Sequence, residues 1–238
     1  MTTLTAGVID ILHFRLDIPW TGERPMDALL SDLERERIAR LGLPLLRRRA
    51  ALSRAWLRTV LGQLRGEAPE QVPVEITVHG KPFCRGGPAF NISHSEDRLV
   101  IALSTEGEVG VDIEMIRPLE DLESLAALVF SPAEQRQLST LHPAARLAAF
   151  YRGWTRKEAL IKAVGKGLSM PLEGFSVDLG ETGDNALLSS EIPELLIEDW
   201  QVLPVGCDAQ ATLAVAASAT VQGVRVIHEA QAKATGMW

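Results

Sequence analysis

The spacing of apolar residues divides the chain into short strands and longer helices. Polar and apolar residues alternate over residues 12–18, which is the period of a half-buried strand. Apolar positions three and four residues apart predict helices over residues 26–41, 45–64 and 144–164. The last helix is expected to end at Gly165, because glycine is favoured just beyond a helix C-terminus.

Further strands are predicted where short apolar runs lie between Gly, Pro and acidic segments. Segments 99–103 and 109–113 indicate the two arms of a hairpin, joined by residues 104–108. The tetrapeptide Ser-Pro-Ala-Glu at 131–134 has the form of a helix start, with a serine cap and proline at the first helical position. The remaining predicted strands are residues 74–78, 175–179, 200–203, 213–217 and 224–227.

This order of elements predicts an α+β fold. One strand and two helices are followed by strands, and a second group of helices is again followed by strands. The two groups meet near residues 104–109, so the chain is expected to consist of two halves.

Composition and charge describe an ordinary globular protein. The 238 residues are 46% apolar and 23% charged, which excludes a disordered or collagen-like chain. Cys84 and Cys207 lie singly and predict neither a zinc site nor a disulfide framework, so a reducing cytoplasm is the expected compartment. No apolar run approaches the roughly 18 residues of a membrane span. The net charge of −7 argues against nucleic acid as a partner, while local Lys/Arg clusters can still hold a small phosphorylated ligand.

Asp112 and Glu114 form a pair of carboxylates in an apolar segment. Residues two apart in a strand project to the same side, so both carboxylates face one way while Val111 and Ile113 face the core. Adjacent carboxylates repel unless a cation lies between them, and oxygen ligands of this kind suit Mg²⁺. The spacing alone leaves open a solvated strand end as the alternative.

A second cluster lies on the predicted long helix. Trp154, Glu158 and Lys162 are four residues apart and share one face, so a carboxylate and an ammonium project together. In isolation, a stabilising Glu-to-Lys pair beside a core tryptophan explains these residues better than a functional site does.

A third polar cluster is the segment Phe-Asn-Ile-Ser-His-Ser at residues 90–95. Ser93 and His94 can offer hydrogen-bond donors to a phosphate, or simply close a turn. A catalytic serine needs an acidic partner and an oxyanion hole, and the chain has no nucleophile-elbow motif to support one.

Four motifs, taken together and in this order, resemble the 4'-phosphopantetheinyl transferases of the larger, surfactin-synthetase-activating type. The match is close over residues 81–171, looser in the N-terminal helices and slight in the last third of the chain. The motifs are Gly80-Lys81-Pro82, Phe90-Asn91-Ile92-Ser93-His94-Ser95, Val109-Gly110-Val111-Asp112-Ile113-Glu114 and Trp154-Thr155-Arg156-Lys157-Glu158-Ala159 with Lys162.

The resemblance implies an enzyme that moves 4'-phosphopantetheine from coenzyme A to a serine of an acyl or peptidyl carrier protein, releasing adenosine 3',5'-bisphosphate. Magnesium is the implied cofactor and coenzyme A the co-substrate. The resemblance also implies a monomer of two pseudo-symmetric α/β subdomains, residues 1–106 and 107–238, packed together with the active site at their interface. No membrane partner is expected.

The resemblance assigns roles to the acidic residues. Asp112, Glu114 and Glu158 are the implied Mg²⁺ ligands, and Asp112 would thereby share the metal with the coenzyme A pyrophosphate. Glu158 is also the favoured base for the carrier serine. Glu134 is a competing base, although its position in the helix start is a sufficient structural reason for it.

Basic and hydroxyl residues complete the implied coenzyme site. Lys162 is implied to act in catalysis by holding the pyrophosphate, and Lys157 either assists it or faces solvent. The arginine alignment is open to a shift, because Arg47 and Arg48 adjoin one of the implied positions. The other implied contacts are Lys81 on the nucleotide, Ser93 and His94 as phosphate donors, and Arg37 and Arg49 on the 3'-phosphate.

Two points stay open at the level of sequence. The segment 165–172, with Leu168, Met170 and Leu172, is a candidate docking surface for the carrier protein, and plain packing against the long helix is the alternative. Two other function classes also compete: a non-catalytic module that binds coenzyme A or carrier protein, and a metal-assisted phosphotransferase that uses nucleotide donors. The first predicts loss of an acidic ligand position, and none is lost.

Overall fold

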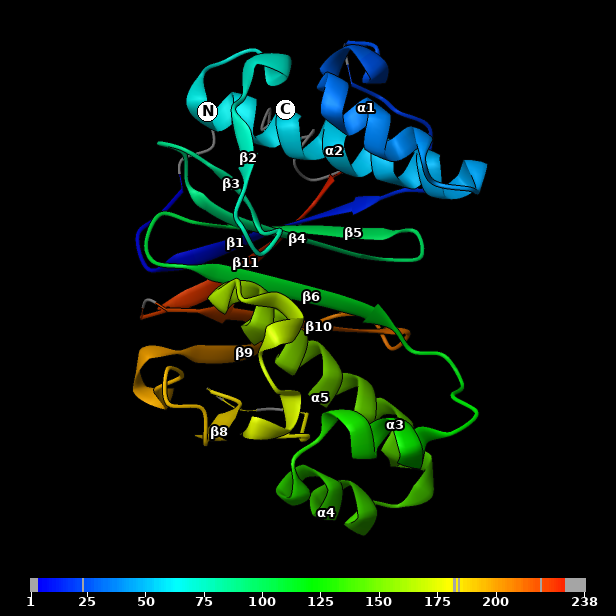
Figure 1. The fold of residues 1–238 in the computed structure, drawn as a ribbon, viewed down its shortest axis with the longest axis vertical. Coiled ribbons are helices and arrows are strands. Elements are labelled where there is room, and N and C mark those ends of the chain that lie inside the picture. The colour runs from blue at the N-terminus through cyan, green and yellow to red at the C-terminus, as the bar shows by residue number, and fades with distance from the viewer. Residues whose placement is uncertain (1–3, 23, 182, 184, 219, 230–238) are drawn as a thin grey trace.

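A computed structural model of the protein describes residues 4–22, 24–181, 183, 185–218 and 220–229. The elements form four layers, in which helices cover the outer faces of two packed sheets (Figure 1). The first half of the chain contributes β1 (Val8–Arg15), α1 (Asp32–Ala39), α2 (Pro44–Arg65), β2 (Val74–Ile76), β3 (Pro82–Cys84), β4 (Ala89–Ser95) and β5 (Arg98–Ser104). The second contributes β6 (Val109–Met115), α3 (Leu122–Val129), α4 (Pro132–Thr140), α5 (Pro143–Val164), β7 (Phe175–Val177), β8 (Leu187–Ser190), β9 (Gln201–Val205), β10 (Ala211–Ala217) and β11 (Gly223–His228). Short 3₁₀ turns lie at Met26–Leu29, Pro69–Gln71, Gly167–Ser169, Leu172–Gly174 and Ile197–Asp199.

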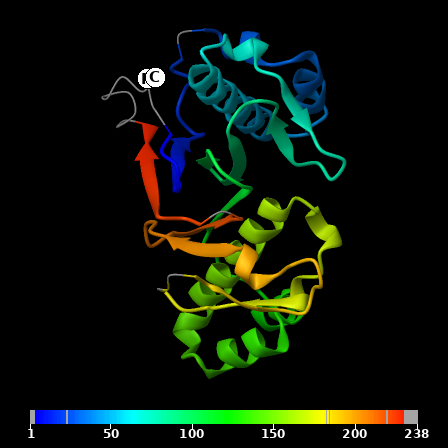
Figure 2. The same cartoon turned by 90° about the vertical axis from the view of Figure 1, so that its left-hand side faces the viewer.

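Two sheets form the middle of the molecule. The first has the strand order β11-β1-β5-β4, with β11 parallel to β1 and the other pairs antiparallel. The second has the order β6-β10-β9 and is antiparallel throughout. Because β11 pairs with β1, a strand from the end of the chain completes the sheet of the first half (Figure 2). The division into subdomains 1–106 and 107–238 remains a prediction.

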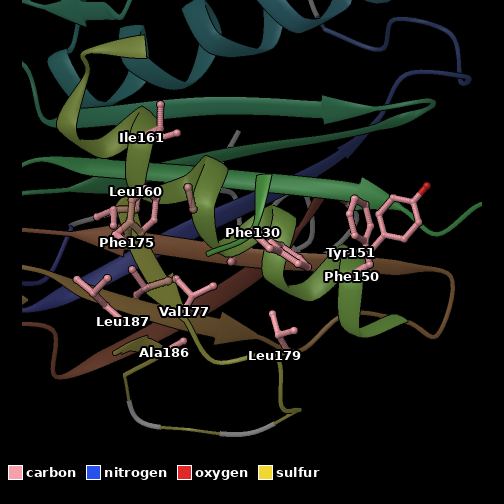
Figure 3. Packing of buried hydrophobic residues seen from close by; sticks show 14 of the residues in the cluster. Phe130, Phe150, Tyr151, Leu160, Ile161, Phe175, Val177, Leu179, Ala186 and Leu187 are labelled. Atoms are coloured by element: carbon pink, nitrogen blue, oxygen red, sulfur yellow. The ribbon is translucent and has the colours of Figure 1, made fainter. Parts of the chain in front are cut away.

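Three apolar clusters hold the layers together. The first lies between α2 and the first sheet and includes Phe14 and Trp56. The second lies between the two sheets and includes Ile11 and Val111. The third surrounds α5 and packs it against the second sheet on one side and against Phe130 and its neighbours on the other (Figure 3). Each layer therefore buries one apolar face of the next, as the α+β prediction requires.

The prediction of an α+β fold is confirmed, and so are the two long helices. Gly165 adopts a left-handed conformation and ends α5 as expected. Ser131 caps α4 in a capping box with Glu134, which confirms the helix start at that tetrapeptide. The helix expected over 26–41 is interrupted, because the side chain of Ser31 caps a new helix, α1. Among the described residues, no helix is both long and apolar enough to span a membrane.

Two local predictions are wrong. Segments 99–103 and 109–113 do not form a hairpin, because β5 pairs with β1 and β4 whereas β6 belongs to the second sheet. Residues 90–95 are not a turn but lie within strand β4, which forms the hairpin with β5. The tight turn of that hairpin places Glu96 at a φ of 51°, a conformation that few non-glycine residues adopt.

Candidate active site at the junction of the two sheets

Side chains of β4 reach the backbone of β6 and so join the two sheets. Asn91, Ser93 and Ser95 alternate along β4 and point to the same side. β6 pairs with β10 along one edge. Along the other edge, the oxygens of these three side chains accept hydrogen bonds from backbone N–H groups of β6, which a neighbouring strand would otherwise satisfy. We refer to these three side chains as the polar seam. The bonds run from Val111 N to Asn91 Oδ1 (3.0 Å), from Ile113 N to Ser93 Oγ (3.5 Å) and from Met115 N to Ser95 Oγ (3.1 Å).

The seam also holds the acidic pair of β6. Ser93 Oγ donates to Asp112 Oδ1 at 2.8 Å, and Ser95 Oγ donates to Glu114 Oε2 at 2.7 Å. Asp112 is 3% exposed, and the alternate residues Val111 and Ile113 are fully buried in the cluster between the sheets. The prediction that both carboxylates share one face of a strand is therefore confirmed.

Helix α5 supplies a cation to this acidic pair. Lys162 Nζ lies 2.5 Å from Asp112 Oδ1 and 2.9 Å from Ser93 Oγ. Burial raises the pKa of Asp112 to about 6, although the Lys162 ammonium opposes this shift. Burial also raises the pKa of Glu158, one turn earlier on α5, and the negative charge of Glu114 adds to that effect. The structure thus brings these four groups from β6 and α5 into one electrostatic cluster.

A close approach of α5 to β6 sets this geometry. Gly110 lies on the same face of β6 as Asp112, and a Cβ there would lie 2.1 Å from the carbonyl oxygen of Ala159. The facing residues of α5 and β10 are small as well, including Ala163 and Ala214. Small residues on both surfaces let the backbones meet, which brings the side chains of α5 within reach of Asp112.

The residues present fit a partly hydrated Mg²⁺. Asp112 Oδ2 is buried and has no hydrogen-bond partner among the described residues, so a ligand position is open. The described residues contain no group of three His, Cys, Asp or Glu side chains that is assembled for a metal on its own. Mg²⁺ usually takes one or two carboxylates and completes its shell with water and substrate phosphates, so a protein cage of three ligands is not required.

Two cavities lie near the residues that hold the acidic pair, and Lys162, which binds Asp112, lines one of them. The smaller, of about 270 Å³, is lined by Lys81, Glu158 and Lys162. The larger, of about 520 Å³, is lined by Arg37, Arg54 and His94 among others. Both cavities include Pro82 and Ile92 in their walls, so they lie on two sides of these residues, and we refer to the two cavities together as the groove.

Cations dominate the larger cavity. Burial lowers the pKa of His94, and the positive charges of Lys162, Arg49 and Arg54 lower it further. Arg49 does not itself line this cavity, and its Nε is buried without a hydrogen-bond partner among the described residues. The cavity also includes Glu34 and Glu75, but their carboxylates are paired with Arg58 at 2.7 Å and with Arg85 at 3.1 Å. An anion is the ligand that such an environment favours.

Alternation along β4 separates Ser93 from His94. Ser93 belongs to the polar seam and donates its hydroxyl hydrogen bond to Asp112, whereas His94 faces the larger cavity. Lys81 lines the smaller cavity, but its ammonium donates to the carbonyl oxygen of Ala163 at 2.8 Å and to Glu108 at 2.5 Å. Lys81 thus stabilises the C-terminal end of α5, and its side chain forms part of the wall of the smaller cavity.

Two expected site residues lie elsewhere. Lys157 is 0% exposed, and its ammonium is bound by Glu134 at 2.8 Å and by the carbonyl oxygens of Leu172 and Phe175. The expectation that Lys157 contacts the coenzyme or faces solvent is corrected, because successive helix residues project about 100° apart, so that Glu158 faces the groove and Lys157 faces the core. Glu134 is 1% exposed and also accepts the N–H of Val177. A carboxylate held by these bonds in the core does not fit the role of a base.

The segment proposed for carrier docking also packs inward. Met170 is buried, and Leu172 packs against the same core cluster. The side chain of Leu168 lies outside the described residues. The alternative of plain packing therefore accounts for Met170 and Leu172.

Sequence reasoning missed Arg54, a half-buried residue of α2 that lines the larger cavity. Burial lowers its pKa, while the carboxylate of Glu34 opposes that shift. The available signal was helical spacing, because Arg54 lies four residues after Ala50 and both line this cavity.

Fold and site together define an α+β protein with a groove lined by basic residues near a pair of carboxylates, of which Asp112 is buried. Comparison with known proteins extends this description. The model of the 4'-phosphopantetheinyl transferase superfamily matches residues 108–216. The 4'-phosphopantetheinyl transferase HetI of Nostoc sp. is 33% identical over 219 residues, which cover 90% of this chain and 89% of that protein.

Two other relatives match shorter parts of the chain. The 4'-phosphopantetheinyl transferase of Bacillus subtilis is 36% identical over 140 residues, or 58% of this chain and 60% of that protein. The 4'-phosphopantetheinyl transferase AcpT of Salmonella typhimurium is 47% identical over 115 residues, or 47% of this chain and 58% of that protein. The chain belongs to the 4'-phosphopantetheinyl transferase superfamily, and its 238 residues fit the larger type.

Proposed function

We propose that the protein transfers 4'-phosphopantetheine from coenzyme A to a serine of an acyl or peptidyl carrier protein, with Mg²⁺ as cofactor. The observation that carries the proposal is the groove: Arg37 and Arg54 line its larger cavity, and its smaller cavity is lined by Glu158 and by Lys162, the cation bound to Asp112. Coenzyme A carries a phosphate at the 3' position and a pyrophosphate at the 5' position of its ribose, so its binding site requires basic residues at two places.

In this proposal the larger cavity binds the nucleotide end of coenzyme A. Arg37, Arg49 and Arg54 supply the planar donors that recognise the 3'-phosphate, with His94 beside them. Lys162 gives up part of its contact with Asp112 and donates to the pyrophosphate instead.

The acidic residues act at the reacting end. Asp112 and Glu114 would hold Mg²⁺, with Glu158 as the third acidic ligand. When bound, this ion supplies positive charge to the pyrophosphate as negative charge develops on its bridging oxygen. The metal requires Asp112 in its ionised form, and the nearby Lys162 ammonium favours that form.

Glu158 is the proposed general base. Its carboxylate lines the smaller cavity, and a raised pKa strengthens it as an acceptor for the hydroxyl proton of the carrier serine. The serine oxygen forms a bond to the phosphorus attached to pantetheine, and the bond from that phosphorus to the bridging oxygen breaks. The serine proton passes to Glu158, and adenosine 3',5'-bisphosphate leaves with the electron pair of the broken bond.

The test is incubation of the purified protein with coenzyme A, Mg²⁺ and a panel of apo acyl and peptidyl carrier proteins. Intact mass spectrometry should show a gain of about 340 Da on a carrier serine. Glu158→Gln is expected to lower kcat by about 100-fold or more while coenzyme A binding is retained. Glu173→Gln, also on a glutamate in the C-terminal half but outside both cavities, is the matched control.

The competing functions give different results in the same experiment. Binding of coenzyme A without a mass gain on any carrier would indicate a binding module. Turnover of nucleotide donors with indifference to coenzyme A would indicate another phosphotransferase. Either result would refute the proposal.

A further inference from the structure

The polar seam repeats one hydrogen-bonding unit at a spacing of two residues. Ser95 Oγ donates to Glu114 Oε2 at 2.7 Å and accepts from the N–H of Met115 at 3.1 Å. Two residues earlier, Ser93 Oγ donates to Asp112 and accepts the N–H of the residue after it. Each serine thus binds a carboxylate and the following backbone amide of β6.

The two acids differ in how many partners hold them. Asp112 is bound by Ser93 and by Lys162. Glu114 is bound by Ser95, and the described residues provide it with no second hydrogen-bond donor. A glutamate side chain has three rotatable bonds and is only partly buried here, so loss of its donor would release the carboxylate to several rotamers.

Ser95 is itself held firmly. Its side chain is 5% exposed, and its residue pairs with Arg98 at the end of the β4–β5 hairpin. The hydroxyl proton can be given to one acceptor only, and here that acceptor is Glu114. The bond from Met115 N fixes the serine oxygen from the other side, which orients the proton towards the carboxylate.

We infer that Ser95 is a positioning residue, which holds the Glu114 carboxylate in line with Asp112 for the divalent cation of the site. The inference rests on the proposed function, because that function requires both carboxylates to bind one ion. Hydrogen-bonded partners of ligating carboxylates orient them, and loss of such a partner commonly lowers metal affinity or activity by about 10- to 100-fold.

The experiment measures Mn²⁺ binding by electron paramagnetic resonance in the presence of coenzyme A. Mn²⁺ is a suitable probe because it prefers the same oxygen ligands as Mg²⁺. Ser95→Ala should weaken Mn²⁺ binding by about tenfold or more and raise the Mg²⁺ concentration for half-maximal transfer in parallel. Ser95→Thr keeps the hydroxyl and should restore most of the affinity. Hydrogen exchange at the Met115 amide should accelerate in the alanine variant and not in the threonine variant.

Ser104→Ala is the matched control. Ser104 is similarly buried on the neighbouring strand β5, but among the described residues its hydroxyl bonds only to the backbone of Glu106. The control should leave Mn²⁺ binding unchanged. If Ser95→Ala fails to fold, Ser95→Cys decides instead, because a thiol keeps the shape and donates only weakly.

Three results would overturn the inference. They are unchanged Mn²⁺ affinity in Ser95→Ala, an equal loss in Ser104→Ala, and a threonine variant as weak as the alanine variant. Failure of the proposed function is distinguishable from these results. It shows as a wild-type protein that transfers nothing to the carrier panel, whereas failure of the inference shows as an active enzyme in which Ser95→Ala leaves cation binding intact.

Discussion

Replacement of Gly110 by alanine tests whether close packing of α5 on β6 builds the site. A Cβ at this position would lie 2.1 Å from the carbonyl oxygen of Ala159 and 2.3 Å from the nitrogen of Ala163. The shorter distance falls about 1.3 Å below the 3.4 Å at which such contacts become ordinary, and both neighbours are backbone atoms that cannot rotate away. The helix must therefore withdraw from the strand by about 1 Å.

The cost of this movement should appear in both stability and activity. Overpacking of a core costs about 1–3 kcal/mol, and the backbone clash places Gly110→Ala near 3 kcal/mol. For a chain of this size, that free energy lowers the melting temperature by about 6–12 °C. The same shift pulls Lys162 away from Asp112, now at 2.5 Å, and a misplacement of about 1 Å can cost about 100-fold in rate.

Thermal unfolding and steady-state transfer kinetics measure the two effects. Gly223→Ala is the control, because Gly223 also lies in a strand but its Cβ would meet nothing within 4 Å. The control should melt and react as the wild type does. A Gly110→Ala protein with the wild-type melting temperature and kcat/KM would refute the argument that this glycine sets the distance between α5 and β6.

Three further predictions concern residues in and away from the groove. Arg54→Ala should raise the KM for coenzyme A by about 10- to 100-fold with little change in kcat, because a charged hydrogen bond to a phosphate is worth about 1.5–3 kcal/mol; a KM within about twofold of wild type would remove Arg54 from the site. Lys157→Met should lower the free energy of unfolding by about 3–5 kcal/mol in urea titrations, because it leaves the Glu134 carboxylate buried without its cation; retention of full stability would contradict the buried pair. Burial, assisted by the positive charge of His228, lowers the pKa of His13 from 6.5 to about 4, so the unfolded chain takes up this proton first as the pH falls. The free energy of unfolding should therefore decrease between pH 6.5 and 4, by about 3 kcal/mol for the full pKa shift and by about 1 kcal/mol after allowance for partial exposure. His13→Gln should flatten the plot of unfolding free energy against pH in this range, and an unaltered plot would refute the assignment.

The spacing of apolar residues predicted the elements that pack apolar residues into a core cluster. α2 packs one apolar side on a core cluster, α5 is surrounded by another, and β1 packs alternate residues on the clusters at its two faces, so their spacing shows in the sequence. Strand β4 also alternates, but its Asn91, Ser93 and Ser95 point inward and replace a strand partner for the β6 backbone. In the sequence alone, polar residues on a buried strand face resemble a loop, because their hydrogen-bond partners on another strand cannot be recognised.

The sequence did not predict which distant segments pair, either as strands or as ion pairs. The apolar runs of β5 and β6 are adjacent in the chain, and nothing in their composition shows that they belong to different sheets. Lys157 looks like a surface residue because its partner Glu134 lies on another helix. The acidic pair was predictable for the opposite reason, since Asp112 and Glu114 are two residues apart and a strand places such residues on one face by itself.

The parallel pairing of β11 with β1 has a consequence for biosynthesis. A chain that emerges from the ribosome in order presents β1 and β5 early, but the outer edge of β1 stays uncovered until residues 223–228 arrive. Open strand edges invite pairing with other chains, so a stalled or shortened product that lacks this last strand is a candidate for aggregation. Maturation of the N-terminal sheet is thereby postponed until residues 223–228 have been translated.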